Sequence, residues 1–244
     1  MPGTGAERPV ALVSGGAGSI GGACVARLRA AGFPTVAGWR TAEPAHGPAV
    51  RFDTTVEAEV EAAVAEVEDA WGPLGVVVAN AGFAHLDLAV RMSEERFRAV
   101  VDTNLTGSFL LARAALRRML PRRRGRIIFV GSAAGTWGVP GVAPYAGSKA
   151  ALSGLARTLA REAGPRNVTV NVVAPGLLAN AVGEIEAHRP TSGVDAAWRA
   201  ATPARRVGTA DEVSAAVAFL ASERAGAITG ATLAVDGGFS LGLG

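Results

Sequence analysis

Two residue types that are otherwise missing from the chain stand four positions apart. Tyr145 is the only tyrosine among the 244 residues, and Lys149 is the only lysine. On a helix this spacing places both side chains on one face, about 6 Å apart along the axis. A phenol has a pKa of about 10 in water, and a nearby ammonium group lowers that pKa toward the neutral range. The pair therefore predicts a tuned proton donor, although a chance pair on a helix surface has the same spacing.

A glycine-rich turn comes earlier, between an expected strand at 10–14 and a helical pattern that runs to residue 31. Glycines in such a turn let the backbone approach a pyrophosphate, and the N-terminus of the helix attracts its charge. The order strand, turn, helix therefore predicts a dinucleotide-binding site. The residues of this predicted site are Ser14, Gly15, Gly16, Gly18, Ser19, Ile20 and Gly21.

The ends of the next two strands bear on the choice of cofactor. The strand at 35–39 is followed by Arg40, where an NAD site usually has an acidic residue for the ribose 2′-hydroxyl. An arginine suits a 2′-phosphate through a planar, charge-assisted contact, so we expect NADP(H) rather than NAD(H). Asp53 follows the third strand and has two interpretations: it accepts a hydrogen bond from the adenine amino group, or it caps the helix at 56–71, with Thr54 and Thr55 as rival caps.

Further strands are expected at 50–52, 74–79, 127–130, 168–173 and 232–235, and further helices at 93–120 (with a bend), from Tyr145 to 163, and at 210–221. This alternation predicts an α/β fold with a parallel sheet. Small or polar residues stand just past the strand ends, where ligands bind in such sheets. They include Asn80, Ala81, Gly82, Ser132, Pro175 and Gly176. Asn104 lies inside the long helix and predicts a kink or a water site there, because asparagine is a mediocre helix former.

Composition narrows the class of protein. A length of 244 residues with 49% hydrophobic residues fits one domain with a full core, and no apolar run is long enough to span a membrane. We expect a flexible tail at 1–8, a single domain at 9–244, and a lid over the site at 177–202. The start of the chain lacks the pattern of a secretory signal, and the single Cys24 cannot form an internal disulfide, so we expect a cytoplasmic protein.

The charged residues give little sign of a macromolecular partner. The net charge is only +3, and neither a nucleic-acid-binding signature nor a metal-binding motif stands out. The basic run at 122–126 has two interpretations: a solvated surface, or a site for an anionic carrier or nucleotide tail.

Taken together, these motifs resemble the short-chain dehydrogenase/reductase family over nearly the whole chain. The resemblance rests on the glycine turn, Asn80-Ala81-Gly82, Asn104, Ser132 thirteen residues before Tyr145, Lys149 and Pro175-Gly176. It implies a single Rossmann-type, doubly wound domain with seven parallel strands in the order 3-2-1-4-5-6-7. The segments 203–208 and 228–230, with Asp236-Gly237-Gly238, look most like the 3-oxoacyl-acyl-carrier-protein reductases of that family.

The resemblance also implies a mechanism and a set of cofactor contacts. Tyr145 would protonate the developing alkoxide, Ser132 would bind the carbonyl oxygen, Lys149 would hold the nicotinamide ribose, and Asn104 would fix a water in a proton relay. Arg123 and Arg166 stand where these enzymes dock the acidic carrier. The chain departs from the family pattern at Ser19, which replaces a glycine, at Ala79, and at Asn180, which replaces a threonine that helps to hold the nicotinamide.

The resemblance leaves the substrate open. We expect an NADPH-dependent reduction of a ketone to a secondary alcohol, with a 3-oxoacyl thioester of carrier protein or CoA as the first choice, in fatty acid or polyketide biosynthesis. A polyketide, steroid-like or sugar-derived ketone is the alternative within the family, and a non-catalytic NADP-binding regulator or scaffold is the alternative outside it. Relatives are usually homotetramers, and the small residues Ala150, Ala151, Gly154 and Ala156 would permit close helix contacts between copies, or packing on the chain's own sheet.

Overall fold

The computed structural model of the protein describes residues 8–179 and 194–241. Seven parallel strands form one sheet in the order β3-β2-β1-β4-β5-β6-β7, as predicted. The strands are β1 (Val10–Ser14), β2 (Thr35–Trp39), β3 (Ala49–Arg51), β4 (Leu74–Ala79), β5 (Gly125–Val130), β6 (Val168–Pro175) and β7 (Thr232–Val235). The helices are α1 (Ser19–Ala30), α2 (Glu57–Trp71), α3 (Glu94–Val101), α4 (Gly107–Arg122), α5 (Ala134–Trp137), α6 (Ala143–Ala163), α8 (Val194–Ala201) and α9 (Ala210–Ala221).

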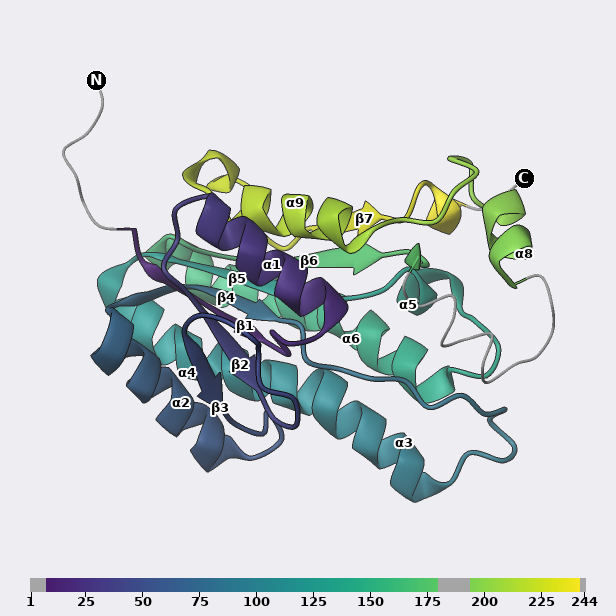
Figure 1. Ribbon diagram of the computed structural model, residues 1–244, viewed down its shortest axis with the longest axis horizontal. Helices are drawn as coiled ribbons and strands as arrows, with labels where there is room; N and C mark the ends of the chain where they lie inside the picture. Colours follow the sequence, from purple (N-terminus) through teal and green to yellow (C-terminus); the bar gives the residue numbers. More distant parts are fainter. Residues whose placement is uncertain (1–7, 180–193, 242–244) are drawn as a thin grey trace.

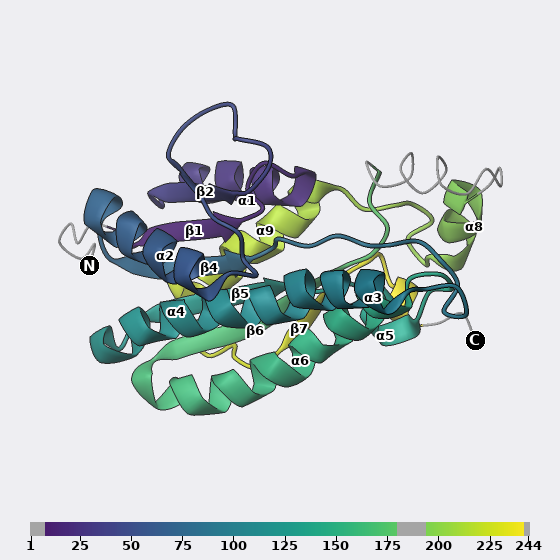
Figure 2. The same cartoon turned by 90° about the horizontal axis from the view of Figure 1, so that it is seen from below.

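The helices form a layer on each face of the sheet (Figures 1 and 2). Helices α1 and α9 pack on one face, and α2, α4 and α6 pack on the other. Side chains of β1 alternate between the two resulting cores, with Leu12 in one and Val13 in the other. Because both faces are covered, the central strands are apolar on both sides, and every residue of β4 is buried.

Helix α6 shows how the sequence pattern fixes one such layer. Its residues Leu152, Ala156, Leu159 and Ala163 are buried against the sheet, at the three- and four-residue spacing of one helical face. Pro144 stands in the first turn, where a missing N–H costs no helical hydrogen bond. The buried stripe therefore sets the rotation of the helix, and with it the direction of the side chains in its first two turns.

The expected long helix at 93–120 is interrupted where the sequence predicted a bend. Helix α3 passes through a π-helical segment, Asp102–Thr106, into α4, and Asn104 lies in that segment. Other boundaries shift by a few residues: β3 ends at Arg51, β5 starts at Gly125 and β6 continues to Pro175. A short helix that the sequence pattern did not predict, α5, ends at Trp137.

Some expectations concern residues outside the described part of the chain. Most of the predicted tail, the central part of the predicted lid and Asn180 lie outside the described residues. Within the described residues, no helix is long and apolar enough to cross a membrane.

Candidate active site

A pocket of about 1000 Å³ follows the carboxyl edge of the sheet. It is lined by the ends of β1, β2, β4, β5 and β6 and by the first turns of α1 and α6. Most of the predicted cofactor and catalytic residues line it: Ser14, Gly15, Gly18, Ser19, Ile20, Gly21, Arg40, Asn80, Ala81, Gly82, Ser132, Tyr145, Lys149, Pro175 and Gly176. The structure thus gathers residues that are as much as 162 positions apart in the sequence around one cavity, as the strand ends predicted.

The glycine turn leaves room for a ligand because its backbone lacks side chains. Gly15 has a φ of 65°, a left-handed conformation that favours glycine. A Cβ atom on Gly21 would overlap with the carbonyl oxygen of Gly15, and one on Gly82 would lie 2.8 Å from Asn104 Oδ1. Helix α1 has no acidic residue in its first turn and its N-cap residue, Gly18, makes no side-chain capping bond. These features fit a pyrophosphate at the start of α1 and a nucleotide along the strand ends.

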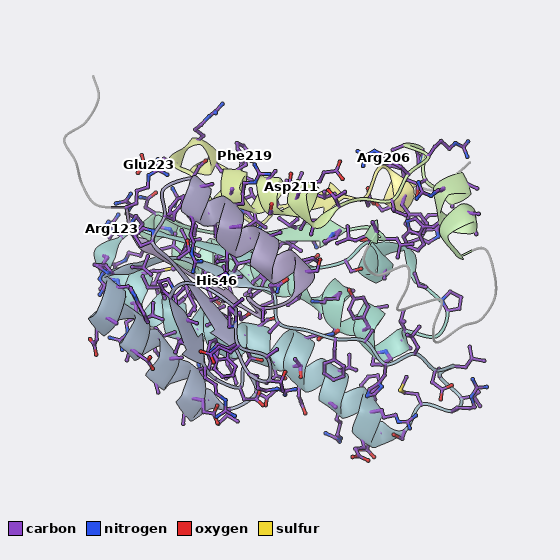
Figure 3. The ribbon with its side chains drawn as sticks, viewed as in Figure 1. His46, Arg123, Arg206, Asp211, Phe219 and Glu223 are labelled. Atoms are coloured by element: carbon purple, nitrogen blue, oxygen red, sulfur yellow. The ribbon has the colours of Figure 1, made fainter. Side chains whose placement is uncertain are left out.

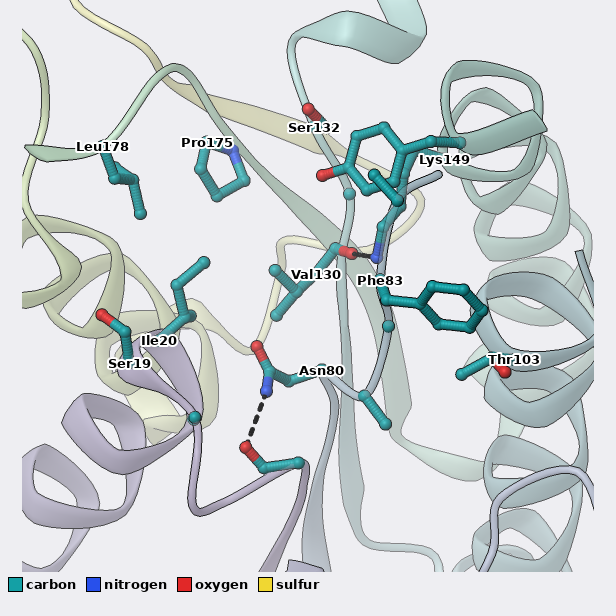
Figure 4. Close-up of a pocket in the computed structure, with 18 of the residues that line it drawn as sticks. Ser19, Ile20, Asn80, Phe83, Thr103, Val130, Ser132, Lys149, Pro175 and Leu178 are labelled. Carbon is teal, nitrogen blue, oxygen red and sulfur yellow. Dashed lines mark hydrogen bonds between the residues drawn. The ribbon is translucent and has the colours of Figure 1, made fainter. Parts of the chain in front are cut away.

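Next to the glycine turn, hydrogen bonds join the end of β1 to the turn that follows β4. Ser14 Oγ accepts from the backbone N–H groups of Asn80 (3.0 Å) and Ala81 (3.1 Å). Asn80 Nδ2 donates to the carbonyl oxygens of Ser14 (3.0 Å) and Gly15 (3.2 Å). Asn80 and Ser14 therefore hold the two turns at a fixed separation (Figure 4).

Gly16, predicted among the cofactor residues, is not part of the pocket lining. A Cβ on Gly16 would lie 2.7 Å from the Cβ of Ala37 in β2. The glycine at this position is therefore explained by the close approach of the turn to β2.

Arg40 lines the far end of the pocket, where the cofactor phosphate was predicted. Its Nη1 donates to Asp53 Oδ2 (3.1 Å), and its side chain is about half exposed. Asp53 itself is not part of the lining. Its other carboxylate oxygen accepts from the backbone N–H and the hydroxyl of Thr55, at 2.8 and 2.7 Å.

One of the two expected roles of Asp53, as a helix cap, is wrong. The N-cap residue of α2 is Val56, which makes no side-chain capping bond, so Asp53 closes the preceding turn rather than capping the helix. The rival caps, Thr54 and Thr55, are not the N-cap residue of α2 either. Burial raises the pKa of the Asp53 carboxyl, but the hydrogen bonds from Thr55 and Arg40 outweigh it and lower the pKa below its usual value.

The opposite end of the pocket holds Ser132, Tyr145 and Lys149. Ser132 Oγ accepts from the backbone N–H of Ala134 (3.2 Å), and the Ser132 hydroxyl is near enough to the phenol of Tyr145 to act on its pKa. Lys149 Nζ donates to the carbonyl oxygen of Val130 at 2.8 Å, as drawn in Figure 4. The same nitrogen lies 5.7 Å from the centre of the Tyr145 ring. The spacing of four residues thus brings the ammonium and the phenol to one wall of the pocket.

The expected lowering of the Tyr145 pKa is wrong for the chain without a cofactor. Burial raises the pKa of this phenol, and the hydrogen bond with Ser132 only partly opposes that effect. Burial also lowers the pKa of Lys149 to about 8, because a charged ammonium is disfavoured away from water. The sequence argument considered the attraction between the two groups and not their shared desolvation. A phenol that keeps its proton still has the form that an acid catalyst needs.

Asn104 is buried behind the pocket rather than in its lining. Its Nδ2 donates to the carbonyl oxygen of Phe83 (3.0 Å) and to Ser148 Oγ (3.1 Å), and its Oδ1 accepts from the N–H of Phe83 (3.0 Å). Ser148 Oγ in turn donates to the carbonyl oxygen of Tyr145 (2.8 Å). The π-helical segment therefore ties the loop after β4 to the first turn of α6 and helps to hold Tyr145 in place.

Arg123 and Arg166 lie at the other edge of the sheet, away from the pocket. Arg123 precedes β5 whereas Ser132 follows it, and Arg166 similarly precedes β6. At about 3.3 Å per residue, the length of β5 separates Arg123 from Ser132 by roughly 20 Å. Figure 3 shows Arg123 at the same end of the molecule as Glu223, opposite Arg206. The structure does not bring these two arginines to the pocket of their own chain.

Several lining residues were not singled out from the sequence. They are mainly apolar and include Phe83, Leu86, Val139, Val142, Leu177, Leu178 and Trp198, with Thr41, His85 and Thr103 as polar exceptions. Their positions after strand ends were a general signal, but an apolar residue in a loop does not reveal from sequence whether it faces a ligand or the core. The described residues contain no group of three or more His, Cys, Asp or Glu side chains that could hold a metal ion.

Known proteins resemble the chain over almost all of its length. A family model described as enoyl-(acyl carrier protein) reductase matches residues 15–240. The 3-oxoacyl-[acyl-carrier-protein] reductase MabA of Mycobacterium avium is 42% identical over 95% of this chain and 89% of its own. FabG of Escherichia coli, with the same activity in its name, is 38% identical over 95% of this chain and 97% of its own. The crystal structure of gox2181 superimposes with a TM-score of 0.87 at 32% identity and covers 97% of each chain.

Proposed function

The chain belongs to the short-chain dehydrogenase/reductase family, and we propose that it is an NADPH-dependent reductase that converts the ketone of a 3-oxoacyl thioester into a secondary alcohol. The observation that carries the proposal is the Ser132–Tyr145 pair, in which two hydroxyl groups meet at the wall of a pocket large enough for a nucleotide and a substrate. Relatives named for this reaction, similar over nearly the full length, support the choice of substrate.

The chain's own residues divide the work of the reaction. The nicotinamide, when bound, supplies the hydride. Ser132 donates a hydrogen bond to the substrate oxygen, where negative charge grows in the transition state, and Tyr145 delivers the proton to that oxygen. The side chain of Lys149 is held by the carbonyl oxygen of Val130. When the Lys149 amine is protonated, it places a positive charge beside the phenol of Tyr145. Asn104 keeps the loop after β4 and the start of α6 in register through Phe83 and Ser148.

The residues that would bind the cofactor's phosphates lie at the end of the pocket away from Ser132 and Tyr145. The open backbone around Gly15, Gly18 and Gly21 receives the pyrophosphate, and Ser19 adds a hydroxyl beside it. Arg40 receives the 2′-phosphate by exchanging its pairing with Asp53 for a charge-assisted contact to the cofactor. These assignments favour NADPH over NADH.

Carrier protein is the finer part of the proposal. Docking of an acidic carrier at Arg123 and Arg166 fits only where a second copy of the chain brings its pocket to that edge, because their own pocket lies roughly 20 Å away. The homotetramer or homodimer expected from the family is therefore part of the carrier proposal and not independent of it. A substrate on CoA or on a short thiol needs no such arrangement.

The test is loss of NADPH absorbance with a 3-oxobutanoyl thioester, presented on carrier protein, on CoA and on a short thiol, with NADH in parallel. We expect turnover with NADPH and little with NADH. Crotonyl thioester is the matched control, since it offers a carbon–carbon double bond in place of the ketone, as the description of the family model suggests. Turnover of crotonyl thioester alone, or NADPH binding without turnover of any ketone, would remove the proposal.

A further inference from the structure

Three aromatic rings from separate parts of the chain pack together at one end of the pocket. Trp137 ends α5, Trp198 lies on α8, and Phe239 lies in the turn near the C-terminus. The rings of Trp198 and Phe239 are stacked, with centroids 3.9 Å apart and planes 12° from parallel. Trp137 meets Phe239 edge-on, with centroids 6.3 Å apart. Helices α5 and α8 lie at the same end of the molecule in both ribbon views (Figures 1 and 2).

The stack holds the plane of the Trp198 indole in a fixed direction. Phe239 is buried beneath one face of the indole. Thr202, fully buried at the end of α8, donates its hydroxyl to the carbonyl oxygen of Trp198 (2.8 Å), and Ala204 N–H bonds to the carbonyl oxygen of Gly237 (3.0 Å). Helix α8 is therefore tied to the C-terminal turn by its backbone as well as by the stacked rings.

Trp198 differs from Trp137 in one respect that matters for a substrate. Trp198 lines the pocket, whereas Trp137 has its side chain about half exposed and is not part of the lining. The lining of the same pocket also includes the apolar residues Val139, Val142 and Leu178. The pocket's arginine is at the other end, at Arg40, and its lysine is held by Val130. An uncharged, apolar group therefore fits beside Trp198 better than a phosphate or a carboxylate.

We propose that the face of the Trp198 indole opposite Phe239 is a platform for a flat apolar group, an aryl ring or a conjugated chain, carried on the ketone carbon of the substrate. The inference rests on the proposed function for the position of that ketone, beside Ser132 and Tyr145. A rigid aromatic platform favours a planar group, because offset stacking adds to the gain from simple burial. The substrate class is thus narrowed from 3-oxoacyl thioesters in general to those with an aryl or conjugated substituent next to the ketone.

The test compares thioesters of one short thiol that carry a 3-oxo-3-phenylpropanoyl or a 3-oxobutanoyl group. For Trp198→Leu we expect KM for the phenyl substrate to rise about tenfold more than KM for the methyl substrate. In Trp198→Phe, KM for the phenyl substrate should stay close to that of the unaltered protein, because this variant keeps an aromatic ring stacked on Phe239. Trp137→Leu is the matched control, since it removes the other tryptophan of the cluster without altering the pocket lining.

A binding measurement separates this inference from the proposed function. Calorimetric titration of the NADP-loaded protein with 3-phenylpropanoyl and 3-cyclohexylpropanoyl thioesters, which have no ketone to reduce, tests the platform even where no turnover is seen. Tighter binding of the phenyl compound, lost in Trp198→Leu, would support the platform. Equal binding of the planar and the saturated ring by the unaltered protein, or an equal effect of Trp198→Leu on the phenyl and methyl substrates, would overturn it. The comparison of the planar and the saturated ring uses only the unaltered protein, so it does not depend on whether any variant folds.

Discussion

Polar and charged side chains gather at both edges of the sheet, but their surroundings differ. At the carboxyl edge, Lys149 and Asn104 are buried and Tyr145 and Ser132 meet at a pocket wall. At the amino edge, Arg122, Arg123 and Arg124 of the basic run lie on the surface and pair with acceptors of their own chain: Arg122 with Glu68, Arg123 with the carbonyl oxygen of Pro165, and Arg124 with Glu223. Figure 3 shows Arg123 and Glu223 at this end of the molecule. A concentration of charge is therefore weak evidence for a site, whereas desolvated polar groups around a cavity are strong evidence.

The largest effect should follow from removing the acid at the carboxyl edge. Tyr145→Phe keeps the ring and loses the hydroxyl that meets Ser132. We expect kcat for a 3-oxoacyl thioester to fall by about 10²-fold or more, the usual contribution of general acid catalysis. Arg124→Asp at the amino edge should leave kcat within about twofold of the unaltered enzyme. Steady-state rates decide the matter, and near-full activity of Tyr145→Phe would take the proton transfer away from Tyr145.

A smaller effect, on the choice between NADPH and NADH, is expected when an arginine at the carboxyl edge is replaced by an aspartate; the same replacement at the amino edge is the control. Arg40→Asp places a carboxylate beside Asp53 at the phosphate end of the pocket. A charge-assisted hydrogen bond is worth about 1.5–3 kcal/mol, so the ratio of NADPH to NADH affinity should fall at least about tenfold. Arg124→Asp makes the same change of charge beside Glu223 and should leave the ratio as it was. Fluorescence titration with both cofactors measures it, and equal shifts in the two variants would mean that only the overall charge matters.

The smallest effect is a difference in the pH dependence of stability. Burial lowers the pKa of Lys149 to about 8, so between about pH 8 and 10.5 the unfolded chain binds more protons than the folded one at this residue. The cost of burying the charge is fully present below about pH 8 and is relieved as the pH rises through that window. The stability of the unaltered protein relative to Lys149→Met should therefore increase by up to about 1.4 kcal/mol per pH unit.

Arg126 at the amino edge supplies the matched control for that measurement. It is also buried, and burial lowers its pKa, yet a guanidinium keeps its charge throughout this range. Relative to Arg126→Met, the stability of the unaltered protein should show no such slope. Urea unfolding at pH 7.5, 8.5 and 9.5 gives both differences. If the difference in unfolding free energy between the unaltered protein and Lys149→Met did not change with pH, Lys149 would keep its full charge in the folded state, or water would reach it there.

The sequence was sufficient for features that depend on local pattern. Strands β1, β2, β4 and β7 were placed to the residue, because each is a short run of mainly apolar or β-branched residues between turn signals. The interruption at Asn104 was also visible, because asparagine is a mediocre helix former. The alignment of motifs with strand ends then placed most of the pocket lining at one edge.

Features that depend on the surroundings in three dimensions were not accessible in the same way. The raised pKa of Tyr145 comes from the burial of its phenol in the folded chain. The pairing of Arg40 with Asp53, and of Arg124 with Glu223, joins residues whose proximity no spacing rule reveals. Trp198 lies in a stretch whose pattern predicted only a lid, and its role as a wall depends on the stack with Phe239.

The central claim is that the carboxyl edge reduces a ketone by hydride transfer from NADPH, and isotope transfer tests it most directly. The unaltered enzyme is given [4,4-²H₂]NADPH and a 3-oxobutanoyl thioester, and the product is examined by mass spectrometry and NMR. The account predicts one deuterium on the carbinol carbon of the 3-hydroxyacyl product for each NADPH consumed. A product without deuterium on that carbon, or deuterium on the carbon next to the thioester carbonyl, would contradict it.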